Sequence, residues 1–129
     1  MPDRYIAAFT LIVPDYDAGI DFYVGKLGFD LLEDTPRSET KRWVRVAPKG
    51  AKTAILLAKG VGPEQTAAIG NQTGGRVGFF LHTDNFDRDH KAMLAAGVTF
   101  IEEARHEFYG TVAVFTDPFG NRWDLLEPK

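Results

Sequence analysis

The stretch Asp117-Pro-Phe-Gly-Asn-Arg-Trp-Asp-Leu125 combines a tight turn with the beginning of a strand. Proline and glycine mark the turn, and the residues after it alternate between polar and apolar side chains, as in a half-buried strand. A second turn of this kind, Ala47-Pro-Lys-Gly50, lies 70 residues earlier and also precedes a strand-like run, Ala54-Ile-Leu-Leu57. The two turns are the first sign of an internal duplication.

The sequence before the first turn predicts a strand followed by a helix. Alternating apolar residues indicate a strand at Ile6–Val13. Asp15 or Asp17 is a suitable N-cap for the helix that follows, and Gly28 lies where a glycine would end it. One face of the strand should therefore pack against a helix.

The sequence before the second turn predicts the same order. A strand at Arg76–Thr83 is followed by a helix at Asp84–Ala96, which ends at Gly97. A shift of 69 residues carries Gly28 onto Gly97 and Asp15 onto Asp84. A common order of strand, capped helix, glycine and turn indicates duplication.

Each helix is followed by three further predicted strands. They are Phe29–Thr35, Lys41–Pro48 and Thr53–Ala58 in the first half, and Val98–Ala104, Thr111–Asp117 and Asn121–Glu127 in the second. We therefore expect an α+β protein of two βαβββ modules, with module 1 at about 4–58, a connector at 59–75 and module 2 at 76–129.

Composition excludes several classes of function. Fifteen Lys and Arg against 18 Asp and Glu give a net charge of −3, which disfavours nucleic acid as a partner. The absence of cysteine excludes disulfides and thiolate chemistry. No apolar run is long enough to span a bilayer, and no signal peptide is recognisable, so we expect a cytoplasmic protein without a membrane partner.

The motifs resemble those of a known superfamily. Thr10-Leu-Ile-Val-Pro-Asp15, Ile20-Asp-Phe-Tyr23 and Leu27-Gly-Phe29 resemble the opening of the vicinal oxygen chelate superfamily, and the stretch at 117–125 resembles its Asp-Pro-x-Gly-Asn signature. This superfamily includes glyoxalase I, bleomycin-resistance proteins and extradiol dioxygenases. The resemblance implies two βαβββ modules whose sheets form a cup, and it implies a homodimer.

The resemblance also implies a metal site that this sequence does not complete. In metal-dependent relatives four inward side chains, usually His, Glu or Gln, hold one divalent ion. The corresponding positions here are Ala8, Ala54, Val77 and Asp124. Alanine and valine offer no lone pair, and one carboxylate cannot hold a catalytic ion. We therefore expect no metal and no other cofactor. The three histidines, His82, His90 and His106, do not lie at these positions.

Strand alternation predicts which residues line the cup. The expected ligand-binding residues are Thr10, Trp43, Arg45, Phe79, Phe115, Arg122 and Asp124. Apolar and aromatic walls with a few charged groups are typical of a small-molecule pocket. Arg45 and Asp124 either pair with each other or bind the ligand. The candidate acid–base residues are Asp124, Arg45 and His106.

Three functions fit these expectations. The first is a metal-independent protein that binds a small molecule without chemistry, as the resemblance to bleomycin-resistance proteins implies. The second is a divergent lyase or isomerase of the glyoxalase I type that uses acid–base residues. The third is a non-catalytic structural or regulatory dimer.

Overall fold

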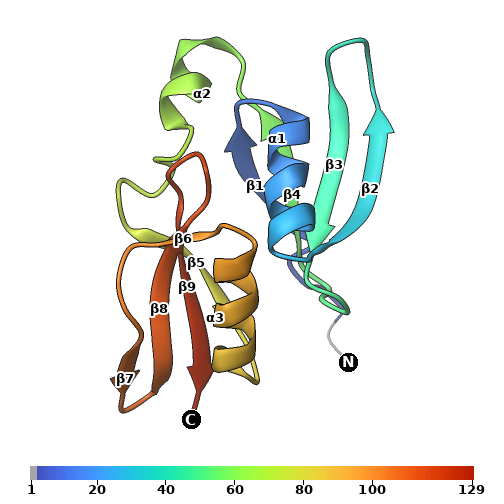
Figure 1. The fold of residues 1–129 in the computed structure, drawn as a ribbon. Helices are drawn as coiled ribbons and strands as arrows, with labels where there is room; N and C mark the ends of the chain where they lie inside the picture. Colours follow the sequence, from blue (N-terminus) through green and yellow to red (C-terminus); the bar gives the residue numbers. More distant parts are fainter. Residues whose placement is uncertain (1–2) are drawn as a thin grey trace. The chain divides into compact units, whose positions relative to one another are not determined.

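The computed structural model describes residues 3–129 and divides into two compact units, of which the first ends at Ile69 and the second begins at Gly70 (Figure 1). Unit 1 contains β1 (Ala8–Val13), α1 (Tyr16–Ile20), the π-helical segment η1 (Asp21–Lys26), β2 (Asp30–Pro36), β3 (Arg42–Ala47), β4 (Ala54–Lys59) and α2 (Gly62–Ala68). Unit 2 contains β5 (Val77–His82), α3 (Phe86–Ala95), β6 (Thr99–Phe100), β7 (Arg105–Glu107), β8 (Gly110–Thr116) and β9 (Arg122–Pro128).

The two sheets have the same topology. Their strand orders are β1-β4-β3-β2 and β5-β9-β8-β6, with β7 also paired to β8. In each sheet the first and last strands of the module are parallel neighbours, and the other pairs are antiparallel. The predicted α+β fold with two βαβββ modules is confirmed.

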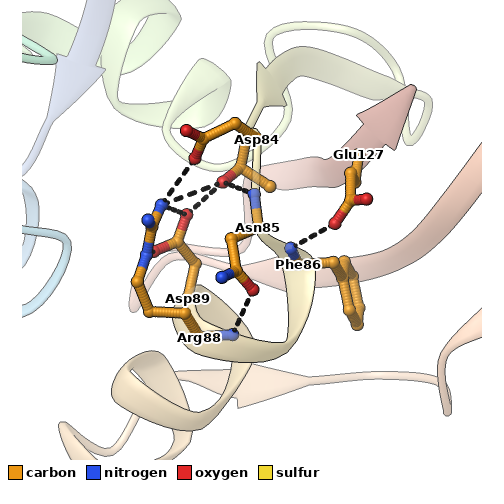
Figure 2. Close-up of polar contacts among 7 residues, drawn as sticks. Asp84, Asn85, Phe86, Arg88, Asp89 and Glu127 are labelled. Atoms are coloured by element: carbon orange, nitrogen blue, oxygen red, sulfur yellow. Dashed lines mark hydrogen bonds and ion pairs between the residues drawn. The ribbon is translucent and has the colours of Figure 1, made fainter. Parts of the chain in front are cut away.

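The helices begin at equivalent caps but differ in length by one residue. The Asp15 carboxylate accepts a hydrogen bond from the Ala18 N–H at 3.0 Å, and the Asn85 side chain accepts one from the Arg88 N–H at 3.0 Å (Figure 2). The N-cap of α3 is therefore Asn85 and not Asp84, which was the predicted counterpart of Asp15. The shift between the modules is thus 70 residues at the caps.

The shift falls to 69 residues at the glycines that end the helices. Gly28 and Gly97 both have positive φ, 77° and 90°, which glycine adopts without strain. Unit 1 accommodates its extra residue in η1, where hydrogen bonds run from i to i+5 instead of i+4.

One face of each sheet packs against a helix. In unit 1 a Cβ on Gly19 would lie 3.0 Å from Leu57 and 3.3 Å from Val13, so this glycine allows α1 to approach the sheet closely. In unit 2 adjacent aromatic rings connect α3 to the sheet; they belong to Phe86, His90, Phe100, Phe115 and Trp123. The Phe86 N–H also donates to the Glu127 carboxylate of β9 at 2.7 Å (Figure 2).

Two segments differ from the expectation. The connector contains the seven-residue helix α2, which begins with Pro63 in its first turn, a position where the missing N–H costs nothing. Of the strand predicted at Val98–Ala104 only β6 forms, because the Glu102 carboxylate, rather than a backbone carbonyl, accepts the Val114 N–H of β8 at 3.1 Å; β7 begins beyond the predicted range, at Arg105. Among residues 3–129, no helix has the length and apolarity needed to cross a membrane.

Candidate functional site

The sheet of unit 1 has a second face that points away from α1, which we call the distal face of unit 1. Strand register places Thr10, Leu56 and Arg45 in one row across β1, β4 and β3. Trp43 shares this face because it lies two residues from Arg45 on the same strand. The Trp43 and Arg45 side chains are half-buried, and Thr10 is exposed. Three of the predicted ligand-binding residues therefore share one face.

A carboxylate that the sequence analysis did not single out organises the distal face of unit 1. Glu33 of β2 accepts hydrogen bonds from Arg45 Nε and from the Thr35 hydroxyl, both at 3.0 Å. Arg37 Nη2 lies 3.9 Å from the same carboxylate. The hydrogen bond from Arg45, and secondarily that from Thr35, lowers the pKa of Glu33. Glu33 is therefore a stable anion between two guanidinium groups.

Arg37 also covers part of the aromatic group of this face. Its guanidinium carbon lies 5.3 Å from the centroid of the Trp43 ring, within the range of a cation–π interaction. The sequence contained a signal for this arrangement, since Glu33 and Thr35 are two residues apart on β2 and Arg37 follows directly after its last residue. However, a register shift between Leu31 and Glu33 changes which residues of β2 point to each face of the sheet, and the sequence of β2 does not reveal this shift.

The distal face of unit 2, on the side of the sheet away from α3, differs from the predicted one. Asp124 has Phe80 and Val114 as its register partners, and Phe80 is 65% exposed. Phe79 and Phe115 are instead partners of Trp123, on the face that packs against α3. The prediction that Phe79 and Phe115 share a face with Asp124 is therefore wrong. Phe115 is fully buried, and the Phe79 ring stacks on Trp123 at 4.8 Å.

The cause is that the predicted correspondence between the modules was off by one residue on β5 and on β8. An error of one residue moves a side chain to the opposite face of a sheet. The caps place Thr10 in correspondence with Phe80, not Phe79. The turn at residues 117–121 is one residue shorter than its counterpart at 48–53, so Arg45 corresponds to Val114, not Phe115.

The same corrections move two of the implied metal positions. Counted from the N-caps, Ala8 corresponds to Gly78 rather than to Val77. The shorter turn likewise makes Leu56, rather than Ala54, the counterpart of Asp124. The set then consists of Ala8, Leu56, Gly78 and Asp124, whose side chains offer a single carboxylate. In addition, no group of three or more His, Asp or Glu side chains within residues 3–129 is placed to hold a metal ion. The residues present do not fit a divalent ion of the kind that metal-dependent relatives hold.

Asp124 lies in a charged cluster formed within unit 2. Burial raises the pKa of Asp124, Arg105 opposes this shift, and the negative charge of Glu102 adds to it. Arg105 is itself held by Glu102, to which Nε donates at 3.0 and 3.2 Å, and by Glu107 at 3.4 Å. Sequence reasoning missed this cluster because it placed Glu102 in a continuous strand and Arg105 beyond the end of that strand.

The remaining predicted site residues lie in different surroundings. Arg122 is exposed and donates to the Gly75 carbonyl at 3.2 Å. His106 lies on β7 opposite Thr111, and its Nδ1 is 3.3 Å from the Thr111 hydroxyl. In the β8–β9 register Thr111 and Asp124 point to opposite faces of the sheet, so His106 does not lie beside Asp124. His82 lies on the same face of the sheet as Asp124, because the β5–β9 register pairs Phe80 with Asp124 and His82 with Leu126.

Asp124→Asn is expected to stabilise the protein at neutral pH. A carboxyl group whose pKa is raised in the folded state contributes most stability when it is protonated, and this contribution is lost as pH rises through the raised pKa. The gain in the melting temperature of Asp124→Asn over the wild type should therefore be larger at pH 7.5 than near pH 4. Asp30→Asn, at an exposed carboxylate, controls for the lost charge. An equal gain at both pH values would contradict the assignment.

The turn between β8 and β9 is held by its own buried carboxylate. Asp117 Oδ1 accepts hydrogen bonds from the N–H groups of Phe119, Gly120 and Asn121 at 2.9–3.0 Å, and Oδ2 accepts one from Asn121 Nδ2 at 2.7 Å. Asp117 and Asn121 are 3% and 5% exposed. The Asp and Asn of this motif therefore have a structural role that needs no ligand.

Comparison with known proteins identifies the family. The chain belongs to the Glyoxalase/Bleomycin resistance protein/Dioxygenase superfamily, which it matches over residues 5–125. A protein of Shewanella frigidimarina (strain NCIMB 400) is 52% identical over 124 residues, covering 95% of this chain and 92% of the relative.

Two solved structures are similar over nearly the whole chain. TnmS3, described as an antibiotic binding protein from Streptomyces sp. CB03234, is 34% identical, with a TM-score of 0.80 and coverage of 100% of this chain and 99% of that one. A glyoxalase/bleomycin resistance protein from Streptomyces sp. CB03234 is 35% identical, with a TM-score of 0.73 and coverage of 95% and 100%. Dimerisation and a cytoplasmic location stay predictions.

Proposed function

We propose that this protein binds a small aromatic organic molecule, and that the distal face of unit 1 is a primary binding surface. The observation that carries the proposal is Trp43, a half-buried indole beside Arg37 and Arg45 on a sheet face that lacks the helix packed on the other side. Aromatic walls with a few placed polar groups are typical of ligand sites. The description of TnmS3 as an antibiotic binding protein supports this class of function.

The distal face of unit 2 supports the same proposal. Phe80 is a large apolar side chain that is 65% exposed on β5, the edge strand of this sheet, beside Asp124. Aromatic side chains are enriched at binding interfaces relative to the rest of a protein's surface. Each face is tested separately because the two belong to different units.

Trp43→Ala is expected to weaken the binding of an aromatic ligand by about tenfold or more, because a stacked aromatic anchor is lost. The ligand would be found by a thermal-shift screen of aromatic compounds, and its dissociation constant measured by isothermal titration calorimetry. Phe80→Ala applies the same test to unit 2.

Phe108→Ala is the matched control for these variants. Phe108 is 88% exposed at the β7–β8 hairpin, so its removal deletes an aromatic group outside the distal faces. It should leave the dissociation constant unchanged. Wild-type affinity in both Trp43→Ala and Phe80→Ala would show that neither face binds the ligand.

A second candidate function is acid–base catalysis by Asp124, favoured by the burial that raises its pKa beside Arg105. Recovery of the ligand after incubation with the protein separates the two functions. A binding protein returns the ligand unchanged, whereas an enzyme returns a product whose formation is lost in Asp124→Asn.

A further inference from the structure

The charges of the distal face of unit 1 are not balanced. The network consists of two guanidinium groups, Arg37 and Arg45, and a single carboxylate, Glu33. The strand alternation that brings them together also places the uncharged Thr10, Thr35 and Leu56 on this face. The network therefore carries one positive charge in excess, next to the indole of Trp43.

The arginines also retain hydrogen-bond donors. Arg45 gives its Nε–H to Glu33, and among residues 3–129 no hydrogen bond is found for its two terminal nitrogens. Its side chain is 35% exposed, so these nitrogens are accessible from solvent. Arg37 is 53% exposed, lies over the Trp43 ring and approaches Glu33 only to 3.9 Å. A guanidinium with unused terminal N–H groups matches the geometry of a carboxylate.

We propose that the distal face of unit 1 selects a planar aromatic anion, with the aromatic plane against Trp43 and a carboxylate on the terminal nitrogens of Arg45. This inference rests on the proposed function and specifies its ligand class. Glu33 holds Arg45 through Nε and at the same time competes with the ligand for the same positive charge. The two effects make different predictions for substitutions at Glu33 and Arg45.

The experiment uses three probes with one aromatic system and different charges: 2-naphthoate, 2-naphthamide and 2-naphthylmethylamine. Calorimetric titration of the wild-type protein at low ionic strength should give a dissociation constant about tenfold lower for the carboxylate than for the amide, with the amine weakest. Raising the salt concentration should reduce the difference between carboxylate and amide.

Three variants assign the selectivity to this network. Arg45→Met should reduce the affinity for the carboxylate to nearly that for the amide. Glu33→Gln should strengthen carboxylate binding several-fold, because the competing anion is removed, and should change amide binding much less. Arg76→Gln removes an exposed arginine of unit 2 and should leave all three dissociation constants as in the wild type.

The outcomes separate this inference from the proposed function. Equal or tighter binding of the amide or the amine would overturn the anion selectivity while leaving aromatic binding intact. Weaker carboxylate binding by Glu33→Gln would also overturn it, because Glu33 would then assist the anion instead of competing with it. Failure of all three probes to bind would overturn both this inference and the assignment of unit 1 as an aromatic-binding surface.

Discussion

Asp117→Ala is expected to lower the free energy of unfolding by about 3–4 kcal/mol, because it removes a buried carboxylate that accepts four hydrogen bonds. Three of the donors are backbone N–H groups of the turn. The loss leaves those of Phe119 and Asn121 without this acceptor, whereas Gly120 N–H keeps the Asp117 backbone carbonyl at 3.3 Å. Urea denaturation followed by far-ultraviolet circular dichroism would measure the change.

Two further variants separate this effect from the loss of a charge. Asp84→Ala removes a carboxylate that is 87% exposed and paired with Arg88, and it should cost less than about 1 kcal/mol. Asp117→Asn keeps one acceptor oxygen but places an NH₂ group in the turn, so its cost in the free energy of unfolding should lie between those of the two alanine variants. A cost for Asp117→Ala no larger than that for Asp84→Ala would show that the carboxylate does not hold the turn.

Gly110→Ala is the second substitution with a large expected cost, about 3–5 kcal/mol. Gly110 begins β8 with a φ of +151°, which L residues rarely adopt. A Cβ at this position would lie 2.2 Å from the backbone carbonyl oxygen of Glu127 on β9. Because this atom belongs to the backbone of the sheet, relief requires the β8–β9 pairing to shift.

Gly25→Ala is the control for Gly110→Ala. Gly25 lies in η1 without a positive φ, and a Cβ added to it would meet no atom within 4 Å. Alanine at this helical position should change the free energy of unfolding by less than about 1 kcal/mol, and in the stabilising direction. If both variants had the same free energy of unfolding, the close approach of Gly110 to the Glu127 carbonyl would not restrict the residue at this position.

The order of elements could be predicted from sequence because its signals are local. Gly28 and Gly97 end their helices with positive φ as expected, and Asp15 is one of the two N-caps proposed for the first helix. Repetition of these signals sufficed to predict two βαβββ modules. Each signal depends on a few neighbouring residues and not on the packing of distant segments.

The faces of unit 2 could not be predicted with the same success, because a face depends on exact register. The extra residue in η1, the register shift beside Gly78 and the shorter turn at 117–121 each change the alignment of the modules by one residue. One residue is enough to exchange Phe79 for Phe80 and Phe115 for Val114. In unit 1 the β1–β4 and β3–β4 pairings have no such shift, and Thr10, Trp43 and Arg45 lie on a common face.

The partners of the charged groups were equally hidden. Glu33 meets Arg45 next to a register shift in β2, and Arg105 meets Glu102 at the break between β6 and β7. Composition shows that such charges exist, whereas their pairing is decided by backbone irregularities that leave little trace in the sequence.

The break between β6 and β7 at Glu102 has a consequence for self-association. A sheet edge with a continuous row of free N–H and C=O groups is a template on which another chain can add a strand. Here that edge consists of two pieces of two and three residues, and a side-chain carboxylate occupies the Val114 N–H between them. Arg105 and Glu107 add charge to the second piece. An incoming strand would have to displace Glu102 and bring its own backbone beside these charges, so this edge is protected against amyloid-like growth.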